Sequence, residues 1–391
     1  MELTTVVILV HVMWIVRMYF KDPFYGMHSI YALSIILLVF VPLVYNIFLL
    51  KEYEATVGIH LSLLAGSMLV GVVKTDYNAL LQLLKDVLIS NKLMNLLMLL
   101  SLAYTLVMLG FGISGHGYAL RFPTIGFFSL AILMMFYTHH FRELYGRRYL
   151  AFFALALLQL LGFFFLLWTG FGRLLLFQFF TITVFFASFY LAKIRVVKFV
   201  IILTIPLMVG VGGALRYEEG SIRGILETGQ GMGSILVPLK YNELIYAGLQ
   251  SEEIKPLYGS SFLASLLFFI PRQFWPEKPV GFGKTMVAWY MPNYYHTEHS
   301  LAGLYLGEVI GNFGLWGLWI GPILIFLLFK ALAGIPKMKY ADFLGFMRLI
   351  VFAIFLAGIS DFVWGGTFVY FSRACIASGS LLLTFWLIGK K

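Results

Sequence analysis

Residues 149–169 read YLAFFALALLQLLGFFFLLWT, an unbroken apolar run without a single charged side chain. An α-helix needs about 20 such residues to cross the roughly 30 Å hydrocarbon core of a bilayer. In hydrocarbon, each backbone N–H and C=O must find its partner within the protein, which a helix provides. This stretch therefore predicts a membrane-spanning helix.

Comparable runs extend from it toward both termini, and they predict an all-α polytopic membrane protein with about 11 transmembrane helices, in a range of 10–12. Eight spans fall within 1–214 and three within 304–391, and residues 215–303 form one large external loop with short helices. The expected spans are 3–20, 28–50, 57–73, 94–112, 122–138, 149–169, 172–192, 197–214, 304–330, 345–361 and 366–388.

The composition agrees with a bilayer as solvent. The 391 residues are 61% hydrophobic and 12% charged, against about 25% charged in soluble domains. The net charge is +10. In a membrane protein such an excess is expected, because basic residues collect in cytoplasmic loops, where anionic lipid attracts them. Because no basic soluble module is interleaved with aromatic residues, we expect no nucleic acid partner. The single Cys375 excludes a disulfide within the chain.

Basic residues gather in alternate connections between the spans, which sets the orientation by the positive-inside rule. The rule places the C-terminus in the cytoplasm, and the N-terminus and the loop 215–303 outside. The basic residues assigned to the cytoplasm are Lys74, Lys85, Lys92, Arg142, Arg147, Arg148, Lys193, Arg195, Lys198, Lys330, Lys337, Lys339, Lys390 and Lys391.

Three shorter stretches predict helices that do not cross the membrane. Residues 260–270 are apolar but too few to span, so we expect a re-entrant or interfacial helix. Residues 237–249 carry leucine and isoleucine at helical spacing, which predicts a second outer helix on the membrane. Residues 76–92 predict an amphipathic helix on the cytoplasmic side.

The sequence has no nucleotide-binding motif of the kind found in soluble enzymes. Gly281-Phe282-Gly283-Lys284 is only a weak look-alike of a nucleotide loop, because no strand precedes it. His296 and His299 flank Glu298, and two histidines with one carboxylate can hold zinc. Without a third strong ligand motif, no metal and no cofactor are predicted.

Cations near the outer side are the main candidates for binding an anion. Arg173 opens the span 172–192, where it either snorkels to the headgroups or faces an outer cavity. Arg373 lies inside the last span, and either pairs with Asp361 or binds a ligand. Arginine suits a pyrophosphate because its planar fork bonds phosphate oxygens in pairs. Five more basic residues lie in the loop 215–303, and each is either a solvated charge or a further ligand of the same anion. They are Arg216, Arg223, Arg272, Lys278 and Lys284.

Two longer motifs are more specific. FFIPRQFWPEKP at 268–279 has three prolines that fix a bent backbone, with aromatic residues suited to a membrane interface. EHSLAGLYLGEVIGNFGLWG at 298–317 places His299 at the entrance of a span and Glu308 deeper. A histidine can take a proton from a hydroxyl near neutral pH. Alternatively, His299 only anchors the helix start and Glu308 pairs with a neighbouring helix.

With these motifs, the chain resembles the bacterial O-antigen polymerases (Wzy-type oligosaccharide repeat-unit polymerases) and, more distantly, the O-antigen ligases. The proline-rich run is similar to the outer-loop signature of the polymerases, and the His299 element to one shared with the ligases. TGFGR at 169–173 resembles a Gly-Ser-Arg opening, with Phe171-Gly172 in place of the usual pair. The ligases usually have Asn after the histidine, and Ser300 here favours a polymerase. The resemblance covers roughly 165–320.

The resemblance implies a GT-C-class glycosyltransferase of the cell inner membrane, with its active site facing the periplasm. Its substrate is an undecaprenyl-diphosphate-linked oligosaccharide, joined into O-antigen or a similar surface polysaccharide without metal. Membrane lipid and a chain-length regulator protein are the other partners to consider. In this reading His299 and Arg173 are catalytic together with Glu298 or Glu308. The diphosphate and glycan are bound by Arg216, Arg223, Arg272, Lys278, Lys284, His296 and Arg373.

Two alternatives stay open at this point. An O-antigen ligase would transfer the glycan to the lipid A core rather than to another lipid-linked repeat. A non-enzymatic transporter of lipid-linked oligosaccharide would spread charged residues through many spans, and would show internal repeats with broken helices. Here the charges concentrate in one outer segment and at the ends of adjacent spans, which favours an enzyme.

Overall fold

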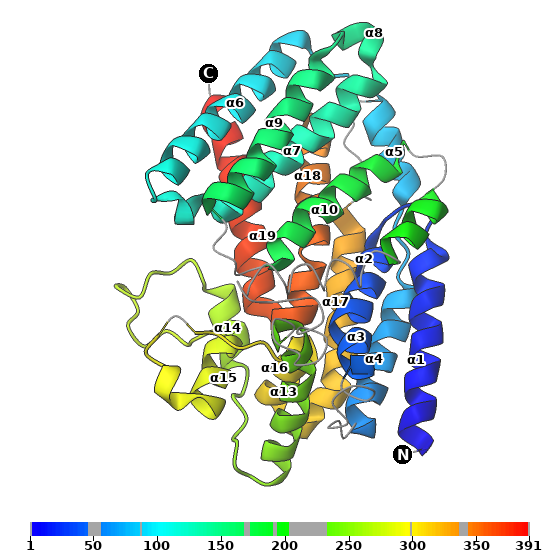
Figure 1. Ribbon diagram of the computed structural model, residues 1–391, viewed down its shortest axis with the longest axis vertical. Coiled ribbons are helices and arrows are strands. Elements are labelled where there is room, and N and C mark those ends of the chain that lie inside the picture. The colour runs from blue at the N-terminus through cyan, green and yellow to red at the C-terminus, as the bar shows by residue number, and fades with distance from the viewer. Residues whose placement is uncertain are drawn as a thin grey trace, which may run out of the picture.

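A computed structural model of the chain describes residues 2–45, 56–86, 88–167, 173–190, 194–202, 233–297, 299–335 and 343–389. Every regular element in these ranges is a helix (Figure 1). The amino-terminal elements are α1 (Glu2–Lys21), α2 (Met27–Ile35), η1 (Ile36–Phe40), α3 (Val41–Tyr45), α4 (Val57–Val72), α5 (Tyr77–Asp86), α6 (Asn91–Ile113), η3 (Gly117–Leu120), α7 (Arg121–His140), α8 (Arg142–Tyr145), α9 (Arg148–Gly162), η4 (Phe163–Leu167) and α10 (Arg173–Ser188).

The second half of the chain holds the short helices α13–α15 and the last apolar helices. Its described elements are α13 (Gly233–Gln250), α14 (Ser260–Leu266), α15 (Phe282–Tyr290), η5 (Pro292–Tyr294), α16 (Leu304–Phe313), η6 (Gly314–Trp316), α17 (Gly317–Gly334), α18 (Phe343–Ala357) and α19 (Ile359–Gly389). A further helical segment covers 194–202.

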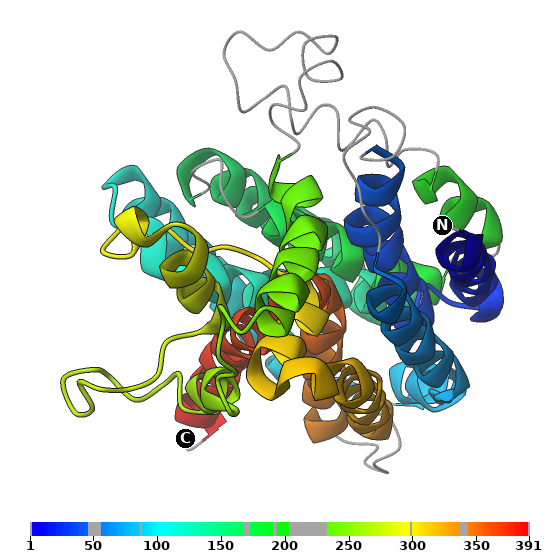
Figure 2. The same ribbon diagram turned by 90° about the horizontal axis from the view of Figure 1, so that it is seen from below.

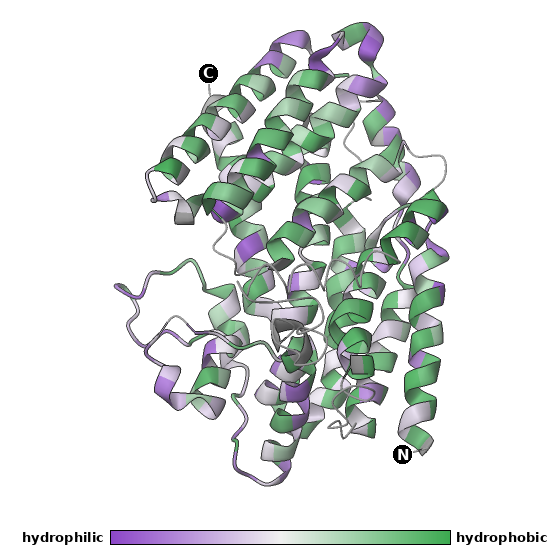
Figure 3. Ribbon diagram, viewed as in Figure 1, coloured by the Kyte–Doolittle hydropathy of each residue, from purple (hydrophilic) through white to green (hydrophobic). Residues whose placement is uncertain are grey.

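Within the described residues, 7 helical segments are long and apolar enough to cross a membrane, and three shorter apolar helices accompany them. Each predicted span except 197–214 coincides with one of these helices, and residues 203–214 lie outside the described residues. Figure 3 shows the long helices almost wholly hydrophobic, with hydrophilic residues collected at α8 and around α13–α15. The structure is therefore that of a helical membrane protein.

The predicted span 304–330 lies within the apolar segment Leu304–Gly334, which is divided at Gly314 into α16 and α17. Gly314 has a positive φ of 63°, a conformation that glycine adopts without steric cost. There the chain folds back, so that a Cβ on Gly321 of α17 would lie 2.9 Å from Leu306 of α16. Hydropathy alone could not detect this turn, because both arms of the hairpin are apolar. With only 10 residues, α16 is too short to cross a bilayer.

The last two predicted spans form an antiparallel hairpin. α19 joins two helices across Gly366, whose φ of 77° is not helical. The Tyr370 hydroxyl donates to the carbonyl of Phe355 at 3.2 Å across the two arms. The turn therefore lies at Gly366, which agrees with the predicted boundary between 345–361 and 366–388.

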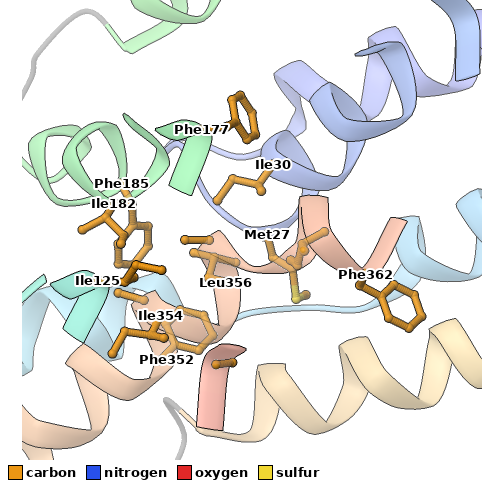
Figure 4. Packing of buried hydrophobic residues seen from close by; sticks show 14 of the residues in the cluster. Met27, Ile30, Ile125, Phe177, Ile182, Phe185, Phe352, Ile354, Leu356 and Phe362 are labelled. Atoms are coloured by element: carbon orange, nitrogen blue, oxygen red, sulfur yellow. The ribbon is translucent and has the colours of Figure 1, made fainter. Parts of the chain in front are cut away.

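The core lies where α7 meets α9, α10, α18 and α19. Figure 4 shows Ile125, Phe185 and Phe352 packed together from three of these helices. Small residues allow close crossings in a membrane. A Cβ on Gly126 of α7 would come within 2.3 Å of the Ala377 carbonyl of α19, so these two helices touch backbone to backbone.

Lys198 is not the solvated loop residue that the charge count assumed. It is fully buried, and its Nζ donates to the carbonyls of Tyr19 (3.1 Å) and Asp22 (2.8 Å) at the end of α1. A helix leaves its last carbonyls without partners, and a lysine can satisfy them. Beside it, Asp22 binds the His28 ring at 2.8 Å and accepts from Tyr77. The Lys198 ammonium therefore caps the C-terminal end of α1.

The other predicted short helices are present. α5 buries Tyr77, Leu80 and Leu84, at the spacing of an amphipathic helix. α13 covers the predicted 237–249, but its buried Leu239 and Ile245 form part of the protein core rather than lying on the membrane. Figure 1 shows α13–α15 at the end of the molecule that also holds the N-terminal end of α1, away from α8 and the C-terminal end of α19, and Figure 2 looks onto the molecule from that end.

Candidate functional site

The candidate site lies around α15, a helix that packs against the rest of the protein through one face. Phe282, Met286 and Val287 are buried, and their spacing puts them on the same side of the helix. A Cβ on Gly311 of α16 would touch the Phe282 ring at 2.7 Å. The opposite face of α15 is thereby held at the surface, where it carries Lys284.

The chain after η5 returns to the start of α15. The Leu301 amide donates to the Gly283 carbonyl at 3.0 Å, and a Cβ on Gly283 would lie 2.2 Å from the Ser300 hydroxyl. Gly283 is therefore required for this close approach. The glycine pattern around Lys284 is explained by packing and not by a nucleotide loop.

This return brings Lys284 and His299 to one residue, Thr297. The Lys284 ammonium donates to the Thr297 carbonyl and lies 5.3 Å from the centre of the Tyr295 ring. His299 Nδ1 lies 2.8 Å from Thr297 Oγ1, and its ring packs on Tyr294 at 4.8 Å. A cation and an imidazole thus share an exposed surface.

The hydrogen bonds of Thr297 bear on the tautomer of His299. When the Thr297 hydroxyl donates its one hydrogen to the Tyr294 carbonyl at 2.7 Å, it can only accept from His299. In this arrangement it accepts from the His299 amide at 3.2 Å and from a protonated Nδ1 at 2.8 Å. In neutral His299 the lone pair then belongs to Nε2, for which the described residues offer no hydrogen-bond partner. This nitrogen can accept a proton.

A second group of cations sits on the proline-rich loop after α14. Lys278 Nζ donates to the carbonyls of Phe268 and Ile270, both at 2.9 Å, which closes residues 268–278 into a loop. Arg272 donates to the Pro276 carbonyl at 3.2 Å and is exposed. Lys278 has three N–H donors, so one is left for a ligand.

The same loop exposes large apolar side chains. Phe269 is 67% and Phe274 is 82% exposed. Aromatic residues beside arginine are typical of the bilayer interface. This arrangement agrees with an interfacial position for 260–270, of which α14 is the helical part.

Burial lowers the pKa of Lys278, and the nearby charge of Arg272 lowers it further. Both effects disfavour the ammonium form. A bound anion would have the opposite effect, so this lysine is suited to receive one.

Arg373 forms an ion pair with Asp361 at 2.7 Å. The same carboxylate is bonded by Gln178 of α10 at 2.5 Å, and the guanidinium lies 5.6 Å from the Phe122 ring. Of the two predicted roles for Arg373, the structure shows the ion pair with Asp361. It ties α10, α7 and α19 together inside the bundle.

Glu308 is fully buried and lies among α14, α16 and α19. Its carboxyl group is hydrogen-bonded to the Ser261 hydroxyl (2.8 Å), the Thr367 hydroxyl (2.9 Å) and the Thr367 amide (2.6 Å). All these partners are polar and neutral. The structure does not bring Glu308 into contact with His299.

Several predicted site residues cannot be placed. Arg216, Arg223 and Glu298 lie outside the described residues, and for Arg173 only its position at the start of α10 is described. His296 is exposed and packs edge-on against Tyr295 at 5.5 Å. In the described part of the chain, no three His, Cys, Asp or Glu side chains group as metal ligands.

Sequence reasoning missed Thr297, Ser261 and Thr367. A threonine two residues before a histidine is a weak signal, because Ser and Thr side chains commonly bond to nearby backbone in loops. Thr367 directly follows the glycine at the turn, Gly366, but nothing in that local sequence indicates a contact with a carboxyl group. Its contact with Glu308 joins residues too far apart in sequence to predict.

Comparison of the chain with known proteins found no relative. No family model, no curated protein and no solved structure matches it.

Proposed function

We propose that the protein is a membrane glycosyltransferase that polymerises undecaprenyl-diphosphate-linked oligosaccharide repeat units into O-antigen or a similar surface polysaccharide. The resemblance of the 268–279 and 298–317 motifs supplies the reaction class. The observation that carries the proposal is the exposed His299, whose Nδ1 contacts Thr297 Oγ1, on the same residue whose carbonyl binds the Lys284 cation. A base next to a cation suits a reaction that removes a proton while an anion departs.

In the proposed reaction, a hydroxyl of the incoming lipid-linked repeat attacks the anomeric carbon of the growing chain. The bond from that carbon to the lipid diphosphate breaks, and the diphosphate leaves with the electron pair. The hydroxyl proton passes to Nε2 of His299. Fixed cations stabilise the charge that develops on the leaving group.

Lys284, Arg272 and Lys278 are the described cations proposed for the diphosphate. Arg173, Arg216 and Arg223 remain proposed ligands from the sequence. The GT-C arrangement, the periplasmic position of the site and a chain-length regulator as partner belong to the same proposal. Arg373 and Glu308 are assigned no direct part in it, because each is bound to other side chains inside the bundle.

The test is a reconstituted reaction with purified protein in nanodiscs and undecaprenyl-diphosphate repeats, with EDTA present. The proposal predicts a ladder of products that grows by one repeat unit, at a rate that EDTA leaves unchanged. Transfer only when lipid A core is supplied would replace the polymerase by a ligase. No product with either acceptor, using native substrate, would contradict an enzyme and favour a transporter.

A further inference from the structure

The buried group around Glu308 contains fewer hydrogens than its contacts need. It is built from Ser261 and Ser265 of α14, Glu308 and Asn312 of α16, and Thr367 of α19. Glu308, Asn312, Ser261 and Ser265 are all buried. Thr367 is half-buried. The four buried side chains must find their hydrogen-bond partners within the protein.

Four oxygen–oxygen contacts in this group each need one hydrogen. The Glu308 Oε1 atom meets the hydroxyls of Ser261 (2.8 Å) and Thr367 (2.9 Å). The Ser265 hydroxyl meets that of Thr367 (2.8 Å) and the Ser261 carbonyl (2.8 Å). The three hydroxyl groups bring only three hydrogens, one each.

The neighbouring amide groups do not supply the missing hydrogen. One Asn312 N–H bonds the Ser261 hydroxyl oxygen (2.7 Å) and the other the Glu308 carbonyl (2.7 Å). The Thr367 N–H points to Glu308 Oε2 (2.6 Å). Each of these hydrogens is already engaged, so one oxygen–oxygen contact still lacks its hydrogen.

We propose that Glu308 is a protonated, neutral carboxylic acid that clamps α14 to the start of the last helix. Its hydrogen lies on Oε1 and is donated to the Thr367 hydroxyl, which donates to Ser265, which donates to the Ser261 carbonyl. The Ser261 hydroxyl donates to Oε1, so all four contacts are satisfied. Such a chain strengthens each of its bonds in turn.

The charge environment favours the same assignment. In the described part of the chain Glu308 has no ion-pair partner: the ion pairs found there join Asp22 to His28 and Asp361 to Arg373. An unpaired carboxylate away from water is strongly disfavoured, and the usual outcome is neutralisation. The clamp fixes α14, and with it the loop that bears Arg272 and Lys278, against the membrane bundle.

Glu308 is therefore a positioning residue and not the base of the proposed reaction. The assignment does not depend on that reaction and can be tested without it. Gln has the same shape as a neutral Glu and supplies N–H donors, so Glu308→Gln is expected to keep the clamp. Glu308→Ala removes it.

The experiment is infrared spectroscopy of the full chain in nanodiscs at pH 8, where exposed carboxylates are ionised. We expect a carbonyl-stretch band of a protonated carboxylic acid that is lost in Glu308→Gln and kept in the control Glu277→Gln, which changes an exposed glutamate of the outer segment. A wild-type spectrum without such a band would overturn the proposal, whether or not the variants fold. So would a band that survives Glu308→Gln.

A thermal unfolding series gives a second readout. Glu308→Gln is expected to melt within about a degree of the wild type, and Glu308→Ala several degrees lower. A Glu308→Gln protein as unstable as Glu308→Ala would contradict a neutral clamp, because it would show that the negative charge itself is needed. Loss of polymer synthesis in His299→Ala with the infrared band intact would separate this inference from the proposed reaction.

Discussion

At the scale of single residues, hydrogen bonding and burial distinguish His299 from Glu308, although the two belong to one sequence motif. His299 and Glu308 belong to one motif and looked like a base with its partner. The structure leaves His299 at the surface and encloses Glu308 among neutral hydrogen-bond partners. Which atom holds a hydrogen depends on contacts such as those of Thr297 with Tyr294, and no spacing rule contains them.

Thr297 is expected to act through His299. Thr297→Val keeps the shape of the side chain but removes the oxygen that accepts from Nδ1, so the ring loses its fixed tautomer and orientation. The turnover rate should fall on the order of 10-fold, with the KM for the lipid-linked repeat nearly unchanged. Thr297→Ser retains the hydroxyl and should restore the rate. Equal losses in both variants, measured in the reconstituted reaction, would show that the hydroxyl has no such part.

Lys278 is expected to give binding a pH dependence of known sign. Because its pKa is lowered by burial and by Arg272, its ammonium is lost at a lower pH than that of an exposed lysine. Affinity for undecaprenyl diphosphate, measured by calorimetry in nanodiscs, should therefore weaken as the pH rises into the alkaline range. Lys278→Arg should remove this early weakening, since a guanidinium keeps its charge. An identical pH profile in the variant would exclude Lys278 as a ligand.

At the scale of elements, the two hairpins turn at glycines with positive φ, Gly314 and Gly366. The long apolar runs were sufficient to predict where spans lie, because transfer from water to hydrocarbon depends on composition over a whole helix. They did not reveal that 304–334 folds back, because a turn between two apolar arms leaves the hydropathy high. The glycines of GNFGLWG at 311–317 were the available signal for it.

Gly366 is expected to be intolerant of a side chain. Its φ is 77°, and a Cβ would lie 2.2 Å from Glu308 Oε2. Gly366→Ala combines backbone strain with overpacking, and should cost about 2–5 kcal/mol of unfolding free energy.

Gly379 is the matched control in the same helix, because nothing lies within 4 Å of a Cβ there. Gly379→Ala should be neutral or stabilising by up to about 1 kcal/mol. Unfolding in mixed micelles compares the two variants. Similar stabilities would contradict the close packing of Gly366 on Glu308.

At the scale of the whole molecule, the charge pattern predicted the relative placement of the termini. The N-terminal end of α1 and the helices α13–α15 share one end, and the C-terminal end of α19 lies toward the other (Figure 1). The pattern was less reliable for individual residues. Lys198 was counted as a cytoplasmic charge, yet it is buried on the carbonyls that end α1, because a residue count does not distinguish a solvated lysine from a capping one.

Thiol labelling tests this orientation. In a Cys375→Ser background, Asn293→Cys on η5 should react with a membrane-impermeant maleimide added to intact spheroplasts. Glu143→Cys on α8 should react only after the membrane is opened. Both positions are exposed, so access to the reagent should depend on the side of the membrane alone. The reverse pattern would place the site in the cytoplasm and exclude the proposed outer-face reaction.

The most direct test of the proposed function is the polymerisation rate of His299→Ala beside that of His116→Ala in nanodiscs. His116 is also an exposed histidine, in the connection between α6 and η3, and has no role in the proposal. Loss of a general base should slow the His299→Ala ladder about 100- to 10,000-fold, while His116→Ala polymerises at the wild-type rate. A His299→Ala protein that builds the ladder as fast as the wild type would contradict the proposal that His299 takes the proton.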